Sequence, residues 1–103
     1  MRKKALLKII NKYGIYNQLK YIHSEYFELD EAVINHELKK SVEYEIPLTE
    51  IIGTKDHIAE ELADCLVMLK QIQYYYDIDD FQIKSIMNTK IDRQLERIKN
   101  ETK

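Results

Sequence analysis

Residues 60–69 read Glu-Glu-Leu-Ala-Asp-Cys-Leu-Val-Met-Leu, and the rest of the chain must fold around this stretch. A helix turns by about 100° per residue, so Glu61 and Asp64 lie on one face about a turn apart. The Leu-Val-Met-Leu run that follows them leaves little of this helix to face water. Carboxylates that lead into a buried helix are costly unless they are paired, hydrogen-bonded or bound to a metal. The same spacing occurs at Glu25 and Glu28, so we expect two long helices that each carry a carboxylate pair.

The composition favours an all-α protein. The 103 residues suffice for one domain covering residues 1–103, and 45% apolar with 33% charged residues is typical of a soluble globular chain. Two glycines and one proline favour long helices over a sheet, which needs frequent turns. No apolar run approaches the ~20 residues of a membrane span, and the lysine-rich start lacks the apolar segment of a signal peptide. The single Cys65 is interpreted as a packing residue, so we expect a cytoplasmic protein with no membrane partner.

The charge is distributed unevenly, although the net charge is only −2. Residues 1–20 carry six bases and no acids, whereas residues 21–64 carry three bases and twelve acids. An acidic field attracts cations rather than phosphate backbones. Nucleic-acid binding is therefore disfavoured as the main function, although the basic N-terminus leaves a small nucleic-acid-associated protein as one alternative.

The apolar periodicity predicts two helices before the middle of the chain. The first covers residues 2–12 and ends near Gly14. The second runs from residue 15 to about residue 40, with the carboxylates on a ridge beside its apolar stripe. That predicted stripe consists of Ile15, Leu19, Ile22, Tyr26, Leu29 and Val33. Residues 41–54 contain Pro47 and Gly53 and are predicted as the one long connection, with room for a short helical turn at residues 48–52.

Two further helices are predicted after this connection. Thr54 is the expected N-cap of a central helix over residues 55–76. The core stripe of that helix is predicted to be Ile58, Leu62, Cys65, Leu69 and Ile72. An acidic turn at residues 77–80, where Asp79 or Asp80 can act as a cap, leads into a last helix over residues 81–100. The basic residues of this helix fall on one side and are Lys90, Arg93 and Arg97.

The two carboxylate pairs and the basic side of the last helix suggest phosphoryl chemistry. Four carboxylates from two facing helices form a hard oxygen-ligand site suited to Mg²⁺ or Mn²⁺. The three basic residues can hold phosphate oxygens. Residues 53–55 read Gly-Thr-Lys like the end of a P-loop, but the earlier glycine of that motif is missing. A metal-activated water attacking a phosphoryl group is the chemistry that this set of residues suits.

The stretches Glu25-Tyr26-Phe27-Glu28-Leu29 and Glu60-Glu61-Leu62-Ala63-Asp64 resemble the ExxE…ExxD signature of the MazG-like all-α nucleotide pyrophosphohydrolases, over roughly residues 15–98. Members of that family are helical bundles, usually dimers or tetramers, which use Mg²⁺ to hydrolyse nucleoside triphosphates between the α and β phosphates. The chain departs from the family at Ser24, where many members have a further glutamate. The resemblance implies that the catalytic metal ligands are Glu25, Glu28, Glu61 and Asp64. It also implies that Lys90 and Arg93, with Arg97 close by, meet the triphosphate.

Simpler interpretations of the same residues remain open. The carboxylates could be solvated helix flanks, and the basic residues could form helix salt bridges. The three histidines fit no paired metal spacing and are expected at the surface or as satisfied polar residues. Tyr13, Tyr16 and Asn17 lie where a base pocket could form.

The prediction is an all-α, oligomeric bundle of four to five helices. The central helix is apolar on nearly all sides between residues 65 and 69, so we expect a homodimer or homotetramer to cover it. The expected activity is Mg²⁺-dependent hydrolysis of a (deoxy)nucleoside triphosphate to the monophosphate and pyrophosphate, as house-cleaning of nucleotide pools. The alternative from another class is a non-catalytic helical binding or regulatory module that kept the bundle.

Overall fold

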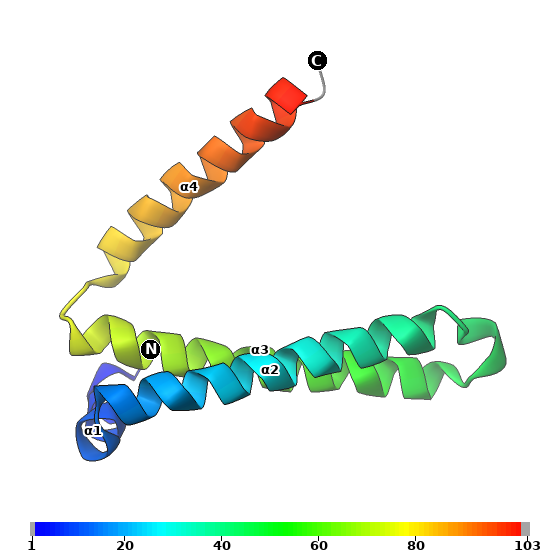
Figure 1. Cartoon of the computed structure of the whole chain (residues 1–103), viewed down its shortest axis with the longest axis horizontal. Helices are drawn as coiled ribbons and strands as arrows, with labels where there is room; N and C mark the ends of the chain where they lie inside the picture. Colours follow the sequence, from blue (N-terminus) through cyan, green and yellow to red (C-terminus); the bar gives the residue numbers. More distant parts are fainter. Residues whose placement is uncertain (1, 102–103) are drawn as a thin grey trace.

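The computed structural model describes residues 2–101, which are mostly helical and contain no strand. The elements are α1 (Lys3–Tyr13), α2 (Ile15–Lys40), a short 3₁₀ turn η1 (Glu43–Glu45), α3 (Leu48–Tyr75) and α4 (Asp80–Glu101). The long helices α2 and α3 lie side by side as a hairpin, and α1 packs at the end of the hairpin away from η1 (Figure 1). The prediction of an all-α fold is confirmed.

Gly14 separates α1 from α2, as the sequence predicts. Its φ of 90° lies in the left-handed region, which glycine enters without the penalty that a Cβ brings. Its N–H donates to the carbonyl oxygen of Ile10 at 2.8 Å and so closes the last turn of α1. Ile10 is fully buried and Leu6 nearly so, and these two side chains attach α1 to the hairpin.

The predicted start of the central helix is wrong. Helix α3 begins at Leu48, directly after Pro47, whose extended backbone precedes the first turn. Gly53 therefore lies inside the helix, where a glycine costs only about 1 kcal/mol relative to alanine. Thr54 is not an N-cap: its hydroxyl donates to the carbonyl oxygen of Ile51 at 2.8 Å and lies 2.8 Å from His36 Nδ1 on α2. Burial of Ile51 and this contact between the helices keep the segment helical despite its glycine.

The faces that meet between α2 and α3 are more polar than the predicted core stripes. On α3 the buried line includes Glu61, Cys65 and Met68, whereas Leu62 and Leu69 are 46% and 52% exposed. On α2 the buried residues are Gln18, Glu25 and Ala32. Several residues of the predicted apolar stripe of α2 are instead exposed, namely Leu19, Tyr26 and Val33. Both helices thus present their carboxylate ridges to each other and leave large apolar side chains outside.

Helix α4 begins at the end of the hairpin where α1 packs, and it projects away from the hairpin (Figure 1). None of its described residues is buried, including five that are at least half exposed although they are large and apolar: Phe81, Met87, Ile91, Leu95 and Ile98. Within residues 2–101 the main packing is among α1, α2 and α3, and α4 joins α3 at Asp80, so a bundle of four or five helices is not completed within one chain. No helix in residues 2–101 is both long enough and apolar enough to cross a membrane.

The corner between α3 and α4 is held by a hydrogen-bond network on Asp80. Its carboxylate accepts hydrogen bonds from Lys70 Nζ at 2.7 Å, from Gln73 Nε2 at 2.9 Å and from Tyr74 Oη at 3.1 Å. These bonds, the one from Lys70 first, lower the pKa of Asp80 to about 2. Asp79 Oδ1 accepts the N–H of Gln82 at 2.7 Å, which confirms the predicted cap. These contacts join the start of α4 to the last two turns of α3.

The Asp80→Asn variant should loosen this corner while leaving the hairpin intact. Asparagine removes the charge that pairs with Lys70 and one of the acceptor oxygens, so amides of residues 76–82 should exchange with deuterium several times faster. Asp77→Asn is the matched control, because the Asp77 side chain is 96% exposed and its ion pair with Lys3 is long, at 3.8 Å. Its φ of 54° is a conformation that asparagine tolerates. Equal exchange in both variants, measured by mass spectrometry, would show that Asp80 does not hold the corner.

Candidate metal centre

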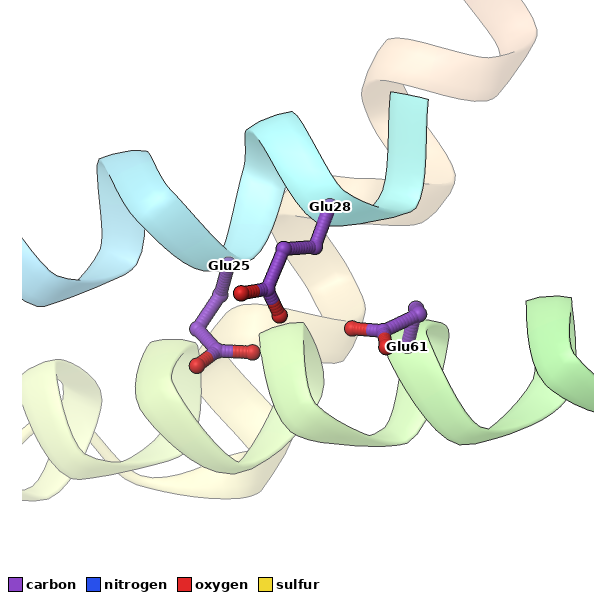
Figure 2. A group of neighbouring side chains, drawn as sticks. All are labelled: Glu25, Glu28 and Glu61. Atoms are coloured by element: carbon purple, nitrogen blue, oxygen red, sulfur yellow. The ribbon is translucent and has the colours of Figure 1, made fainter. Parts of the chain in front are cut away.

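Three carboxylates from the two long helices converge at the middle of the hairpin. Glu25 and Glu28 extend from α2 toward Glu61 on α3 (Figure 2). One oxygen of each carboxylate lies within 4.8 Å of the others. Glu25 and Glu61 are 7% and 9% exposed, whereas Glu28 lies at the rim. The i, i+3 spacing in α2 and the facing position in α3 thus produce the acidic cluster that the sequence predicts, with three of its four proposed members.

Two oxygens in this acidic cluster lack any hydrogen-bond partner. Within residues 2–101, Glu25 Oε2 and Glu61 Oε2 are buried and receive no donor. His57, whose side chain is half-exposed, places Nε2 at 3.6 Å from Glu61 Oε1, the other oxygen of that carboxylate. Buried carboxylates without a partner are strongly unfavourable, whereas an oxygen-binding cation would satisfy them. The donor set is entirely oxygen, which fits Mg²⁺ or Mn²⁺.

Burial raises the pKa of Glu25, and the neighbouring charges of Glu28 and Asp64 raise it further. Burial also raises the pKa of Glu61, with Glu28 adding to the effect and His57 opposing it. Each shift reports that negative charge is unfavourable at this place unless something positive accompanies it. The cluster is therefore arranged to take up either protons or a cation.

Asp64, the fourth predicted ligand, lies to one side. It lines a hollow of about 220 Å³ together with Glu25, Tyr21 and Met68, but it does not belong to the group of three converging oxygens. Its side chain is exposed. Asp64 is thus close enough to influence Glu25 and is free to contact a ligand that lies in this hollow.

A second hollow, of about 400 Å³, opens on the other side of the acidic cluster. It is lined by Glu28, Glu31, Ala32, Asn35, His57 and Glu61. Sequence reasoning assigned no role at the site to Asn35 or His57. The spacing in the sequence could nevertheless have identified both residues. His57 precedes Glu61 by four residues and Asn35 follows Glu28 by seven, so each shares a helix face with a carboxylate.

The predicted basic residues lie elsewhere in the chain. Lys90, Arg93 and Arg97 line one small hollow of about 120 Å³ on α4, on one side of the helix as their spacing predicts. Because α4 projects from the hairpin, the structure does not bring these residues to the carboxylates of the same chain (Figure 1).

Of the three residues proposed for a base pocket, Tyr13 lines the hollow between α1, α2 and α3, whereas Tyr16 and Asn17 have separate environments. Tyr16 is 79% exposed, and Asn17 donates from Nδ2 to the carbonyl oxygen of Tyr13 at 2.7 Å. Neither lines the hollow that lies between α1, α2 and α3, which is formed by other residues.

Comparisons of the chain with protein-family models, with curated proteins and with solved structures gave no match. We therefore infer the function from the chemistry of the acidic cluster and its surroundings.

Proposed function

We propose that this chain is a Mg²⁺-dependent nucleoside triphosphate pyrophosphohydrolase of the MazG-like all-α type, acting in house-cleaning of nucleotide pools. The observation that carries the proposal is the pair of buried carboxylate oxygens without partners, on Glu25 and Glu61, within an all-oxygen cluster. A divalent cation satisfies such oxygens, and cations held in this way bind the phosphate oxygens of nucleotides. The order and spacing of the two acidic motifs add to this support.

In the proposed site, Glu25, Glu28 and Glu61 hold Mg²⁺ or Mn²⁺. When bound, such a cation would neutralise charge on the phosphates and would lower the pKa of a coordinated water molecule. Asp64, beside the cluster, orients the attacking water and accepts its proton. The water oxygen bonds to the α-phosphorus, and the bond from that phosphorus to the oxygen that bridges the α and β phosphates breaks. That oxygen keeps the electron pair, so the products are the nucleoside monophosphate and pyrophosphate.

The proposed enzyme is a homodimer or a dimer of dimers in which α4 of one copy lies on the hairpin of another. Both surfaces have exposed apolar side chains, such as Ile91 and Leu95 on α4 and Leu62 and Leu69 on α3. The basic side of α4 complements the acidic middle of the chain. In a symmetric dimer this contact occurs twice, and each acidic cluster receives Lys90, Arg93 and Arg97 from the other copy. These residues neutralise charge on the departing pyrophosphate.

The test is pyrophosphate release from a panel of ribo- and deoxynucleoside triphosphates. We expect release with Mg²⁺ and none with EDTA, and the preferred base should emerge from the same panel. Glu61→Gln should lower the rate by about a hundredfold or more, because it removes a ligand charge at the cation site.

Glu60→Gln is the matched control, since Glu60 is the adjacent residue and its side chain is 76% exposed. Its rate should stay within about twofold of the wild type. Absence of release from every triphosphate would refute the proposal. Cation binding without any release would instead favour a non-catalytic binding module.

A further inference from the structure

A third hollow, of about 420 Å³, lies where α1, α2 and α3 meet. Ligand-binding pockets usually fall between about 300 and 1,000 Å³, so the hollow is large enough for a small organic group. Its lining combines aromatic, aliphatic and amide side chains: Ile9 and Tyr13 from α1, Gln18 and Tyr21 from α2, and Met68 and Gln71 from α3. No carboxylate in the described part of the chain, residues 2–101, lines this hollow, which sets it apart from the acidic cluster.

This hollow adjoins the acidic cluster. The smaller hollow around Glu25 and Asp64 shares two lining residues with it, Tyr21 and Met68. A ligand with a charged end at the carboxylates can therefore extend past Tyr21 into the space between the three helices. The two ends of that ligand would meet very different surroundings, acidic at one and largely apolar at the other.

The polar part of the lining is a pair of buried glutamines. Gln18 and Gln71 are 7% and 1% exposed, and Gln18 Nε2 donates to Gln71 Oε1 at 2.8 Å. Among the described residues the pair makes one other hydrogen bond, a weak one from Gln71 Nε2 to Met68 Sδ at 3.7 Å. An amide offers two N–H donors and two acceptor positions, so most of the capacity of this pair is unused within residues 2–101.

We propose that this hollow binds the nucleobase of the substrate, with the base stacked on Tyr21 or Tyr13 and its polar edge hydrogen-bonded to Gln18 and Gln71. This inference rests on the proposed function, because the acidic cluster next to the hollow then holds the phosphates. Stacking on aromatic rings combined with hydrogen bonds to the base edge is how proteins hold an unpaired base.

A purely aliphatic ligand fits the hollow less well. It would cover Gln18 and Gln71 without supplying hydrogen bonds, and covering amide groups without partners is unfavourable. A bare sugar or sugar phosphate would leave the tyrosine rings and Met68 without an apolar partner. A flat heterocycle with donors and acceptors on its edge satisfies both parts of the lining.

Binding can be measured at Met68 itself, because its side chain lines the hollow. In protein labelled with ¹³C at the methionine methyls, the Met68 signal is identified from its loss in Met68→Leu. Adenosine, cytidine, guanosine and uridine are titrated without any divalent cation, and ribose 5-phosphate serves as the ligand that lacks a base. We expect a saturable shift of the Met68 signal with at least one nucleoside and none with ribose 5-phosphate.

Substitutions then test which side chains hold the base. Tyr21→Leu should weaken nucleoside binding by about tenfold, whereas Tyr21→Phe keeps the ring and should stay within about twofold. Tyr16→Leu is the matched control, as the same change on the same helix at a residue that does not line the hollow. The double variant Gln18→Leu/Gln71→Leu removes both amides together, so neither amide is left buried without the other as its partner. This variant should lose any preference among the four nucleosides.

The proposal is overturned if no nucleoside shifts the Met68 signal, or if Tyr16→Leu and Tyr21→Leu weaken binding equally. These titrations contain no phosphate chain and no cation. Their failure is therefore distinguishable from failure of Mg²⁺-dependent hydrolysis, which is measured separately as pyrophosphate release.

Discussion

An equimolar mixture of two inactive variants, Glu61→Gln and Lys90→Ala/Arg93→Ala, should recover about a quarter of the wild-type rate of pyrophosphate release. Alone, each variant is expected to lose about a hundredfold or more of the rate, one through its cation site and the other through its phosphate contacts. After random exchange of subunits, half of the dimers contain one chain of each kind. Such a dimer has one site with both defects and one site with none.

The matched control for this recovery is a mixture of Glu61→Gln with Glu25→Gln. Both substitutions lie in the acidic half of the site, so every site in every dimer keeps a defect and no activity should return. Subunit exchange is achieved by unfolding and refolding the two chains together, and mass spectrometry of differently labelled chains confirms it. Exchange without recovery in the first mixture would refute the contribution of α4 from a second copy.

The second large effect concerns stability. Without divalent cations, Glu25→Gln should unfold at a higher temperature than the wild type, whereas with Mg²⁺ the order should reverse. In the wild type, Glu25 Oε2 is buried without a hydrogen-bond partner among residues 2–101, and glutamine removes the charge of this carboxylate. Mg²⁺ should raise the melting temperature of the wild type through binding to the folded state and should do little for the variant. A change of about 1 kcal/mol moves the melting temperature of a domain of this size by roughly 4–8 °C.

Calorimetry with EDTA and with Mg²⁺ checks both halves of this prediction. Glu37→Gln, an exposed change on the same helix, should leave the melting temperature and its response to Mg²⁺ unchanged. If Glu25→Gln lowered the stability without cations, the buried carboxylate would have a partner that stabilises it.

The pH dependence of the cation-free protein follows from the same groups. The pKa values of Glu25 and Glu61 are raised above the ordinary 4.5, so the stability that these groups contribute is complete below about pH 4.5 and is lost as the pH rises through the raised values. The pKa of Asp80 falls from 3.8 to about 2, so its contribution is present above pH 3.8 and is lost as the pH falls toward 2. Stability without cations should therefore be greatest near pH 4, and Mg²⁺ should act mainly above this value.

Much of the fold could be predicted from local sequence signals. The break at Gly14 and the turn before α4 depend on the residues at those positions, and both lie where the sequence predicts. The start of α3 was misplaced, because Gly53 and Pro47 are usual turn residues and the packing of Ile51 against the rest of the chain is invisible in a local pattern. The predicted apolar stripes of α2 and α3 are wrong in part, since several of their residues are exposed, and the reason is related. Apolar periodicity identifies residues that avoid water, but it does not distinguish a core within one chain from a contact between chains.

The acidic cluster was better predicted than the stripes. The two Glu-x-x-acid motifs place their carboxylates by helical geometry alone, so Glu25, Glu28 and Glu61 needed only two facing helices to converge. Gln18 and Gln71 were not predicted, since they are 53 residues apart and meet only through the packing of α2 on α3. In the proposed dimer, the place of Lys90 and Arg93 relative to the carboxylates depends on a second chain, about which a single sequence carries no direct information.

Cys65, the only cysteine of the chain, gives this hairpin a natural chemical reporter. Its thiol is buried between α2 and α3, and burial together with the neighbouring carboxylates raises its pKa, so little of the reactive thiolate forms at neutral pH. An alkylating reagent can then reach it only when the two helices separate. The alkylation rate measures how often the hairpin opens, and a cation bound at the adjacent carboxylates should slow that rate in proportion to its occupancy.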